Sequence, residues 1–568
     1  MLTTLTAPAF AGTWYIEDGD ITISAGESGN NVTQNENTTV NDHDTIITNR
    51  EEGASSHTVT IDAKDEDDKV EVTLKDVNID ANSRSEAAVS VTGKGDTTIE
   101  LDGDNELKGG YNRAGLEHNQ TVDGEGNVTS GKLTIQDENN DGSLNATGGG
   151  FGAGIGGGSA KAGQVTITGG TITAISGDGA GIGGGQGNMG SNAGNADIEI
   201  SGGTIEATGG YTSAGIGGGY YGDATIKITG DAVIKNATGG TFGAGIGGGG
   251  GGNGDVTISG NAKIENAQGG YAGSGIGGGF GASGTVAIKD DSTVTATGGE
   301  VGAGIGGGVG GLADITIEGN ATVNATGGVG SAGIGGGYDA EDDGNGNQIS
   351  IKSNESGAPT VNATGGESSI DEETGEKIPG GAGIGSGVGD AKANITLEGK
   401  VTIVAKAGEG NAAIGDMNGE QVFTGLDGSI TRYDSEGNDT TLPTDPGYPV
   451  PAAPSSSGGG SADASVQESV FPGLVVTDKD GQRISYTSIR GNNVLSIRVG
   501  RFTASLRASL ATLRQLRAEG IDTITFQTIL CSTTLSVDEL LAMGGEDTEV
   551  VLTHHIRSST LTVGGKAV

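Results

Sequence analysis

The sequence contains very little cysteine, proline or aromatic residue. Its 568 residues include one cysteine, Cys531, so no disulfide can form within the chain, and only nine prolines. Aromatic residues make up 3%, so any core must consist of Ile, Val, Leu and Ala. No apolar run approaches the ~20 residues that a membrane-spanning helix needs. Insertion into a membrane is therefore not expected.

Arginine and histidine are missing from most of the chain. No arginine lies between Arg113 and Arg432, and no histidine lies between His118 and His554. A polysaccharide lyase needs a basic residue near its acidic groups, and a glycoside hydrolase needs paired carboxylates at a suitable separation. The middle of the chain therefore favours a non-enzymatic protein, and a carboxylate pair on adjacent repeats remains the open alternative.

Positive charge is scarce as well, since the formal net charge is −43. Residues 465–568 contain ten acidic and ten basic residues, which leaves 63 acidic and 20 basic residues in 1–464. The whole excess lies in the first 464 residues. Such a surface repels nucleic acid and anionic membranes and attracts cations.

Glycine is abundant instead, with 116 residues. The motif Gly-Ala-Gly-Ile-Gly-Gly-Gly at 152–158 returns down the middle of the chain, and most copies are 29 or 30 residues apart. A fixed period of this length indicates a repeat architecture. Its isoleucines are Ile155, Ile182, Ile216, Ile246, Ile276, Ile305 and Ile334, with weaker copies at Ile384 and Ile414.

Each repeat combines the glycine motif with two short β-like segments. One is an apolar-polar-apolar triplet such as Val165-Thr166-Ile167, and the other pairs a branched residue with alanine, as in Ile172 and Ala174. Three short strands separated by glycine turns predict an all-β fold, a right-handed parallel β-helix with coils of about 30 residues. A β-propeller is less compatible, because each blade needs four strands. One extra residue at Ile234/Ala237 and at Ile264/Ala267 predicts a bulge.

Composition divides the chain into five parts. Residues 1–11 end in Ala9-Phe10-Ala11, a cleavage-like pattern, and are predicted to be the remnant of a signal peptide. Residues 12–130 are expected to form irregular first turns and a cap, and 131–441 the regular array, in which 417–441 cap the other end of the column. Residues 442–466 contain five of the nine prolines and a Ser/Gly run, so we interpret them as a linker.

Residues 467–568 predict a small α+β domain. A helix is expected at Ser505–Glu519 from leucines at helical spacing, closed by Gly520, and a second begins at Ser536 with a capping box. Strands are expected at 474–476, 494–499, 523–526 and 550–553. Cys531, His554 and His555 have no recognised metal-ligand spacing.

Aromatic residues gather around the glycine motif and are the first candidates for ligand contact. A stacked array would align them in columns on one edge, where sugar rings can stack on them. The alternative is that they pack on one another and cover the glycine turns. The candidates are Phe151, Tyr211, Tyr220, Phe242, Tyr271, Phe280 and Tyr338.

A calcium site is the second candidate. Asp137, Asn139 and Asp141, followed by Gly142, match the first half of a calcium-binding loop. The carboxylate expected at the twelfth position is missing, because that residue is Gly148. Calcium is the only cofactor that the sequence suggests. Short Asp/Asn/Gly loops also occur as plain turns, so a plain turn is the alternative.

The chain resembles a known group of proteins over roughly residues 12–416. The runs Val70–Leu74, Ala88–Val91, Ile99–Leu101 and Leu133–Ile135 resemble the carbohydrate-binding-domain β-helix proteins of Gram-positive bacterial surfaces, and the glycine motifs resemble those of large secreted adhesin-like proteins. The resemblance implies an extracellular or cell-surface bacterial protein that binds polysaccharide, sometimes with calcium. The internal Leu442-Pro443-Thr444-Asp445 is not a sorting motif, so anchoring to the wall is not expected.

These patterns together predict a non-enzymatic, secreted or surface-exposed protein whose partner is a glycan or a host or cell-surface molecule. Two alternatives remain open. One is a polysaccharide lyase or hydrolase on a β-helix, with acidic residues in the N-terminal turns. The other is a structural stalk that displays the C-terminal domain.

Overall fold

The structure is a computed structural model of the 568-residue chain, and it divides into two compact units, Met1–Pro449 and Val450–Val568. In the first unit it describes residues 12–187, 194–341, 343–370, 377–389 and 391–448. In the second it describes 473–567 except for 480, 485, 492, 500, 502, 529–530, 546–547 and 556–558. The predicted signal remnant and residues 449–466 of the predicted linker lie outside the described residues.

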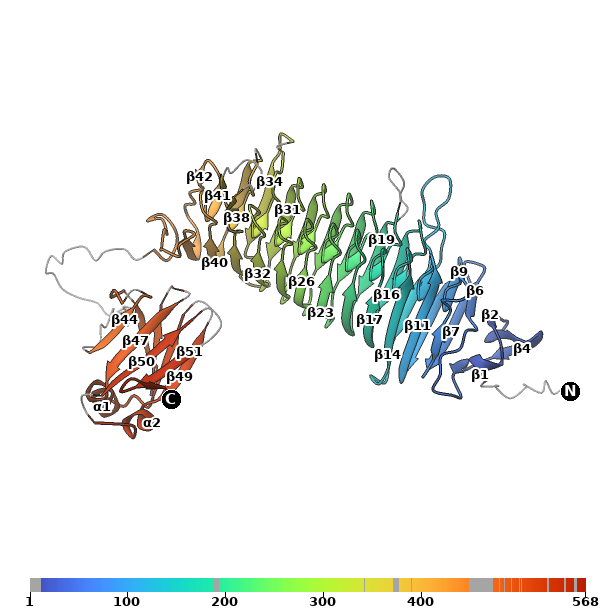
Figure 1. Cartoon of the computed structure of the whole chain (residues 1–568), viewed down its shortest axis with the longest axis horizontal. Helices are drawn as coiled ribbons and strands as arrows, with labels where there is room; N and C mark the ends of the chain where they lie inside the picture. Colours follow the sequence, from blue (N-terminus) through green and yellow to red (C-terminus); the bar gives the residue numbers. More distant parts are fainter. Residues whose placement is uncertain are drawn as a thin grey trace. The chain divides into compact units, whose positions relative to one another are not determined.

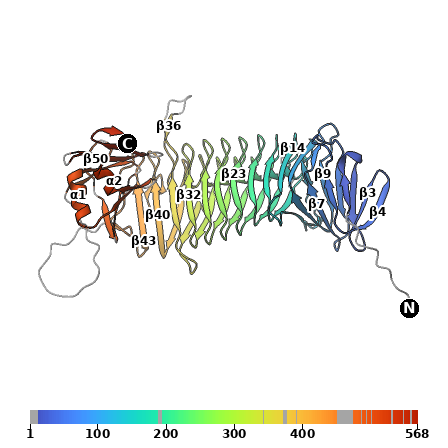
Figure 2. The same ribbon diagram turned by 90° about the horizontal axis from the view of Figure 1, so that it is seen from below.

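The first unit is a parallel β-solenoid with three long sheets, as the repeat predicts (Figures 1 and 2). The first sheet has 13 strands: β1 (Thr13–Tyr15), β5 (Ile46–Thr48), β7 (Lys69–Lys75), β10 (Asp96–Asp102), β13 (Leu133–Gln136), β16 (Gly163–Ile167), β19 (Ala196–Ile200), β22 (Ala224–Ile228), β25 (Gly254–Ile258), β28 (Gly284–Ile288), β31 (Ala313–Glu318), β34 (Asn347–Lys352) and β39 (Ala393–Glu398). The second sheet has 12: β8 (Asn78–Asp80), β11 (Asp104–Tyr111), β14 (Ser143–Gly149), β17 (Thr171–Ile175), β20 (Thr204–Thr208), β23 (Val233–Thr238), β26 (Lys263–Gln268), β29 (Thr293–Thr297), β32 (Thr322–Thr326), β35 (Thr360–Thr364), β40 (Lys400–Lys406) and β43 (Asp427–Tyr433). The third has 16: β4 (Asn37–Asp42), β3 (Asn30–Gln34), β2 (Ile21–Ala25), β6 (Val59–Ala63), β9 (Val89–Gly93), β12 (Leu116–His118), β15 (Ile155–Gly156), β18 (Ile182–Gly183), β21 (Ile216–Gly217), β24 (Ile246–Gly247), β27 (Ile276–Gly277), β30 (Ile305–Gly306), β33 (Ile334–Gly335), β38 (Ile384–Gly385), β41 (Ile414–Asp416) and β42 (Gly419–Glu420).

The register of the sheets explains the repeat. Successive triplets pair in the first sheet, as Val165 does with Ile198, and the branched residues pair in the second, as Ile172 does with Ile205. The motif isoleucines stack in the third sheet, and all nine are completely buried. The core is therefore a set of apolar ladders that no single coil can build alone. The predicted bulge is confirmed, because the register shifts between Ile264 and Ala267.

The third side of each coil is the shortest, since from β15 to β38 its strand is a single Ile-Gly pair. The glycine of that pair has a positive φ, for example +137° at Gly217. A Cβ atom there would lie 1.9 Å from the carbonyl oxygen of Gly247 in the next coil. Both the backbone conformation and the close approach of the next coil require glycine, which explains why the motif recurs.

The N-terminal end of the solenoid is closed by an antiparallel meander. Strand β2 pairs in parallel with β6 on one side and antiparallel with β3 on the other, and β3 then pairs antiparallel with β4. A 3-10 helix, η1 (Ile16–Asp18), stands before β2. The first turns are thus part of the solenoid and also its cap.

The C-terminal end departs in part from its prediction. Residues 417–441 were expected only to cap the column, but they include β43, which adds one more rung to the second sheet beside β40. The column therefore extends further than the glycine motif, because β43 pairs with β40 although no further copy of the motif follows it. A hairpin, β36 (Ser369–Ile370) with β37 (Lys377–Ile378), interrupts the array before β38.

A buried ion-pair network completes this cap. Arg432 is fully buried and donates to the Asp445 carboxylate from Nε (2.7 Å) and from Nη2 (3.0 Å), and it also contacts Glu420. Glu420 in turn accepts the backbone amides of Ala413 and Ile414. Those amides belong to the last glycine corner, which has no further coil to bond.

The second unit has two antiparallel-rich sheets and two helices around one core, in agreement with the predicted α+β domain. One sheet contains β44 (Leu474–Thr477), β47 (Ala504–Ser509), β50 (Glu549–His554), β51 (Ser559–Val563) and β52 (Lys566–Ala567); the other contains β45 (Thr487–Gly491), β46 (Val494–Arg498), β48 (Thr523–Gln527) and β49 (Ser532–Ser536). The helix predicted at Ser505–Glu519 was placed too early, because α1 (Leu510–Ala518) begins only after β47. Helix α2 (Val537–Leu541) starts at the predicted Ser536 cap. No helix among these residues, or elsewhere in the described chain, is long and apolar enough to cross a membrane.

Replacing Arg432 with Met should loosen the C-terminal cap. The change leaves Asp445, which is 4% exposed, buried without its cation, and breaking such a pair costs ~3–5 kcal/mol. Solenoid coils open locally, so we expect faster hydrogen exchange at the Ala413 and Ile414 amides. The matched control is Arg50→Met, which breaks a solvent-exposed pair with Asp18 and should leave exchange at these two amides unchanged. Unchanged exchange at the last corner would show that the pair does not hold the cap.

Candidate ligand-binding edge

One edge of the solenoid, where the second sheet turns into the third, carries most of the candidate side chains. We call it the loop edge. Its loops follow the pattern seen in Gly209-Gly210-Tyr211-Thr212-Ser213-Ala214-Gly215, and the glycines allow close stacking. A Cβ at Gly240 would lie 1.7 Å from the carbonyl oxygen of Gly210. The positions between the glycines are the ones that can carry a side chain outward.

Three of the seven aromatic candidates form one continuous cluster here, Tyr211 and Phe242 from loops of this edge and Phe280 from the turn that follows β27. The ring centroids of Tyr211 and Phe242 are 5.5 Å apart and nearly perpendicular, and those of Phe242 and Phe280 are 5.4 Å apart. The backbone joins the same residues, since the amide of Phe280 donates to the carbonyl of Phe242 (2.8 Å). Phe242 is half-buried, whereas Tyr211 is 58% and Phe280 is 46% exposed. The central ring thus supports two exposed ones.

The other four candidates lie in smaller groups. Phe151 contacts Tyr111 at 5.8 Å between ring centroids, and Tyr220 contacts Tyr221 at 4.0 Å. Tyr338 lies over Gly330, where its ring would meet a Cβ at 2.7 Å. Tyr271 is 51% exposed. The rings therefore pack on one another and on glycine turns, and several also present a large surface to solvent.

Tyr111 and Tyr221 are aromatic members that sequence reasoning missed. The sequence does indicate Tyr111, because Gly109-Gly110-Tyr111 is followed by Ala114-Gly115 at the same spacing as the glycines and alanine around Tyr211. It is 57% exposed. Tyr221 had no such signal, since its position after the glycine triplet is occupied by glycine in the next coil, at Gly251, over which its ring lies.

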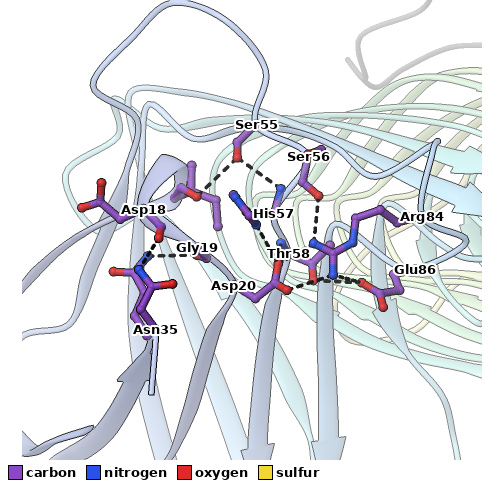
Figure 3. A network of polar contacts seen from close by, with 12 residues as sticks. Asp18, Gly19, Asp20, Asn35, Ser55, Ser56, His57, Thr58, Arg84 and Glu86 are labelled. Atoms are coloured by element: carbon purple, nitrogen blue, oxygen red, sulfur yellow. Dashed lines mark hydrogen bonds and ion pairs between the residues drawn. The ribbon is translucent and has the colours of Figure 1, made fainter. Parts of the chain in front are cut away.

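The N-terminal end of the loop edge is polar. Figure 3 shows Asp20 between His57 and Arg84. The Arg84 guanidinium donates two hydrogen bonds to the Asp20 carboxylate (2.6 and 2.9 Å), and the Thr58 amide donates a third (2.9 Å). The hydrogen bonds from Arg84 lower the pKa of Asp20 to about 2, against the opposing effect of partial burial. The carboxylate stays ionised and orders three successive loops.

Arginine is concentrated near this end. Arg50, Arg84 and Arg113 are the only arginines before Arg432. Each pairs with a carboxylate: Arg50 with Asp18, Arg84 with Asp20 and also Glu86, and Arg113 with Glu117. They are therefore already neutralised and contribute fixed polar groups more than free positive charge.

The loop predicted to bind calcium uses its first carboxylate for its own turn. Asp137 is 9% exposed and accepts the backbone amides of Asp141 (3.2 Å) and Gly142 (3.1 Å). Asn139 is exposed and lines a neighbouring groove. Across the described residues, no group of three His, Cys, Asp or Glu side chains is arranged to hold a metal ion. The geometry matches the plain-turn alternative, and calcium binding here stays a prediction.

The neighbouring groove was not anticipated. It has a volume of about 390 Å³ on the outer surface of the first sheet near the N-terminus. Glu100 lies two residues along and one strand over from Glu71, because Thr98 pairs with Glu71. One Glu100 oxygen accepts the Glu138 amide at 2.8 Å, and the other is buried without a hydrogen-bond partner in the part of the chain that is described. Its lining residues are His43, Asp44, Thr45, Glu71, Val72, Thr73, Thr98, Glu100, Gln136, Glu138 and Asn139.

Cys531, His554 and His555 do not form a shared site. His554 is completely buried, and its two ring nitrogens contact the hydroxyls of Thr528 (3.1 Å) and Thr533 (2.9 Å). Burial lowers the pKa of His554, with a smaller contribution from His555. The Cys531 thiol instead contacts the His555 carbonyl. His554 is thus a core residue satisfied by hydroxyl groups.

Comparison with known proteins supports the repeat architecture and indicates no function. Five segments match a family model described as a beta helix repeat: residues 140–159, 165–186, 198–220, 286–309 and 315–338. The middle of the chain is built of beta helix repeats. No curated protein and no solved structure matches the chain. The beta helix repeats explain the stacked coils and the glycine corners, while the outward side chains have to be interpreted from their own geometry.

The Asp20 site should give a measurable acid dependence. Because its pKa in the folded protein is about 2 and its ordinary value is 3.8, the ion pair stabilises the first turns above pH ~4 and is lost as the pH falls towards 2. The pair is half-exposed, so the loss should be no more than about 1 kcal/mol. NMR titration of the Asp20 carboxyl should report this low midpoint, and Arg84→Gln should raise it towards 3.8. A wild-type midpoint near 4 would contradict the contact.

Proposed function

We propose that the solenoid is a non-enzymatic extracellular protein that binds carbohydrate along the loop edge. The observation that carries the proposal is the continuous cluster of Tyr211, Phe242 and Phe280, in which the outer two rings are about half-exposed. Aromatic faces offer apolar area with little loss of conformational freedom, and the C–H faces of sugar rings stack on them. Exposed tyrosine and phenylalanine on an otherwise aromatic-poor surface favour this use.

The spacing of the coils supports a polymer as ligand. Neighbouring parallel strands are ~4.8 Å apart, which is close to the length that one pyranose adds to an extended chain. A glycan that runs along the solenoid would meet a loop of the edge at each sugar. The strong negative charge of residues 1–464 favours neutral or cationic glycans over anionic ones. The resemblance to carbohydrate-binding and adhesin-like surface proteins agrees with this assignment.

Alanine replacement of the exposed rings tests the proposal. Tyr211→Ala and Phe280→Ala should each weaken glycan binding about tenfold, equivalent to ~1.4 kcal/mol, with only a small loss of stability, because both side chains are about half-exposed. The matched control is Val40→Ala, an exposed apolar residue on β4. A glycan array on the whole protein, with and without calcium, identifies the ligand, and titration calorimetry measures the variants. Absence of any bound glycan would favour the structural-stalk alternative.

The groove beside Glu71 and Glu100 favours one second candidate, hydrolysis of a polysaccharide. The register puts the two Cα atoms on the order of 8 Å apart, compatible with the ~6.5–9.5 Å between the carboxyl groups of inverting glycosidases. Under the binding proposal we expect no new reducing ends when the protein is incubated with the glycans that it binds. Release of reducing ends that Glu71→Gln and Glu100→Gln both abolish would establish an enzyme instead.

A further inference from the structure

The second unit carries a pocket to which the glycan proposal assigns no role. It has a volume of about 550 Å³ and lies on one face of the sheet that contains β44, β47 and β50. The other face of this sheet contributes Leu474, Val476 and Leu506 to the core. The described residues that line the pocket are Gly473, Val475, Thr477, Gly481, Arg483, Arg507, Ala508, Ser509 and Glu549.

The strand register places two arginines on the outer face. Thr477 lies opposite Arg483, and Val475 lies opposite Arg507. Since residues directly opposite share a face and residues two apart on a strand do as well, all four side chains point to the same side. The two arginine Cα atoms are on the order of 12 Å apart, two strands and two residues away from each other. Their long side chains can converge over Val475 and Thr477.

Thr477 is the unusual member of this pocket. It is only 5% exposed, and its hydroxyl has no hydrogen-bond partner among the residues that the structure describes. A buried hydroxyl without a partner is unfavourable, and such groups call for an explanation. Thr477 lines the pocket, and a change of its rotamer would turn the hydroxyl towards a ligand that accepts the missing hydrogen bond.

The charges around Thr477 favour an anion. Arg483 is exposed and has no ion pair with any described residue, while Arg507 pairs with Glu549 at 3.3 Å. Both members of that pair are exposed, at 42% and 56%, so the pair is weak and easily exchanged. Helix α1 begins directly after Ser509 and has no acidic residue in its first turn, which adds to the positive potential. Glu549 is the only carboxylate among the described lining residues.

We propose that this pocket binds a tetrahedral oxyanion, a phosphate or sulfate group. Arg483 and Arg507 supply planar guanidinium donors that match such a group, and the Thr477 hydroxyl supplies a third donor from the floor. Glu549 forms an ion pair with Arg507 when no ligand is bound, and the ligand displaces it from that pair. The volume exceeds that of the ion alone, so the group fits as an ester on a sugar-sized carrier as well as in its free form.

Titration calorimetry on the full-length protein tests this proposal with four probes: inorganic phosphate, inorganic sulfate, a hexose 6-phosphate and a hexose 6-sulfate. Acetate, a planar anion, is the comparison ligand. Arg483→Gln should weaken binding at least tenfold, because it removes a charge-assisted hydrogen bond. Glu549→Gln should tighten binding severalfold, because it removes the competing carboxylate. The matched control is Arg514→Gln, an exposed arginine on α1 outside the pocket, which should change affinity less than twofold.

Thr477→Val separates a binding role from a structural one. The change keeps the shape and removes the hydroxyl, so it should weaken binding severalfold without lowering the melting temperature. If the esters bind more tightly than the inorganic ions, the ligand is a phosphate or sulfate ester on a carrier. If they bind equally, the free ion is sufficient, and both outcomes support the site. The proposal is overturned if none of the probes binds at millimolar concentration, if acetate binds as tightly, or if Arg483→Gln has no effect. None of these outcomes depends on whether the solenoid binds glycan.

Discussion

The close stacking of backbone on backbone at the glycine corners is the constraint on which the solenoid depends. The third side of a coil is a single Ile-Gly pair over most of the array, so the chain has to reverse sharply and still lie one strand spacing from the next coil. With a Cβ at Gly217 lying 1.9 Å from the carbonyl oxygen of Gly247, no side chain is tolerated there. The corner therefore fixes glycine and isoleucine, and variation is confined to the loop residues between glycines.

The same constraint explains how the array begins and ends. Within the array the amide two residues before each motif isoleucine donates to a carbonyl of its own coil, as Ala153 does to Gly157. In the coil before the array, the Glu117 carboxylate accepts the equivalent amide of Ala114. After the last corner, Glu420 accepts the amides of Ala413 and Ile414, which at the other corners bond to carbonyls of the next coil. A carboxylate thus replaces the backbone acceptor at both ends. Each of these carboxylates is balanced by an arginine, which accounts for two of the four arginines in residues 1–464.

The sequence predicts the solenoid well because two patterns agree. The alternation of apolar and polar residues indicates short strands, and the repeat of about 30 residues indicates how the strands stack. Ladders such as Ile155 on Ile182 follow directly from aligning the repeats. Prediction was weaker where one pattern fits two structures. Leu506 and Leu510 are at helical spacing, yet Leu506 alternates inward with Ala504 and Ala508 in β47, and the helix begins only at Leu510.

The candidate sites show a similar division. The contacts of Phe242 with Tyr211 and Phe280 were hard to predict, because the three rings lie at different positions relative to their motif isoleucines. The gathering of aromatic residues beside the glycine motif was predictable, since the repeat brings every copy of the motif to the same edge. The Glu71–Glu100 groove and the pocket around Thr477 were not, because they depend on register between strands that share no repeat. Arg483 and Arg507 are 24 positions apart, and nothing in their spacing indicates that they face one pocket.

The distribution of charge gives the two units different ligand preferences. The excess of acidic residues lies entirely in residues 1–464, and the arginines at the loop edge are already paired, so a phosphate or sulfate group is repelled from the solenoid. Residues 465–568 carry equal numbers of acidic and basic residues, and there an arginine pocket can hold an anion without overcoming a large opposing field. An uncharged sugar face suits the aromatic loops for the converse reason, because stacking does not depend on charge. The two proposed sites are therefore complementary in chemistry, and each can be tested without the other.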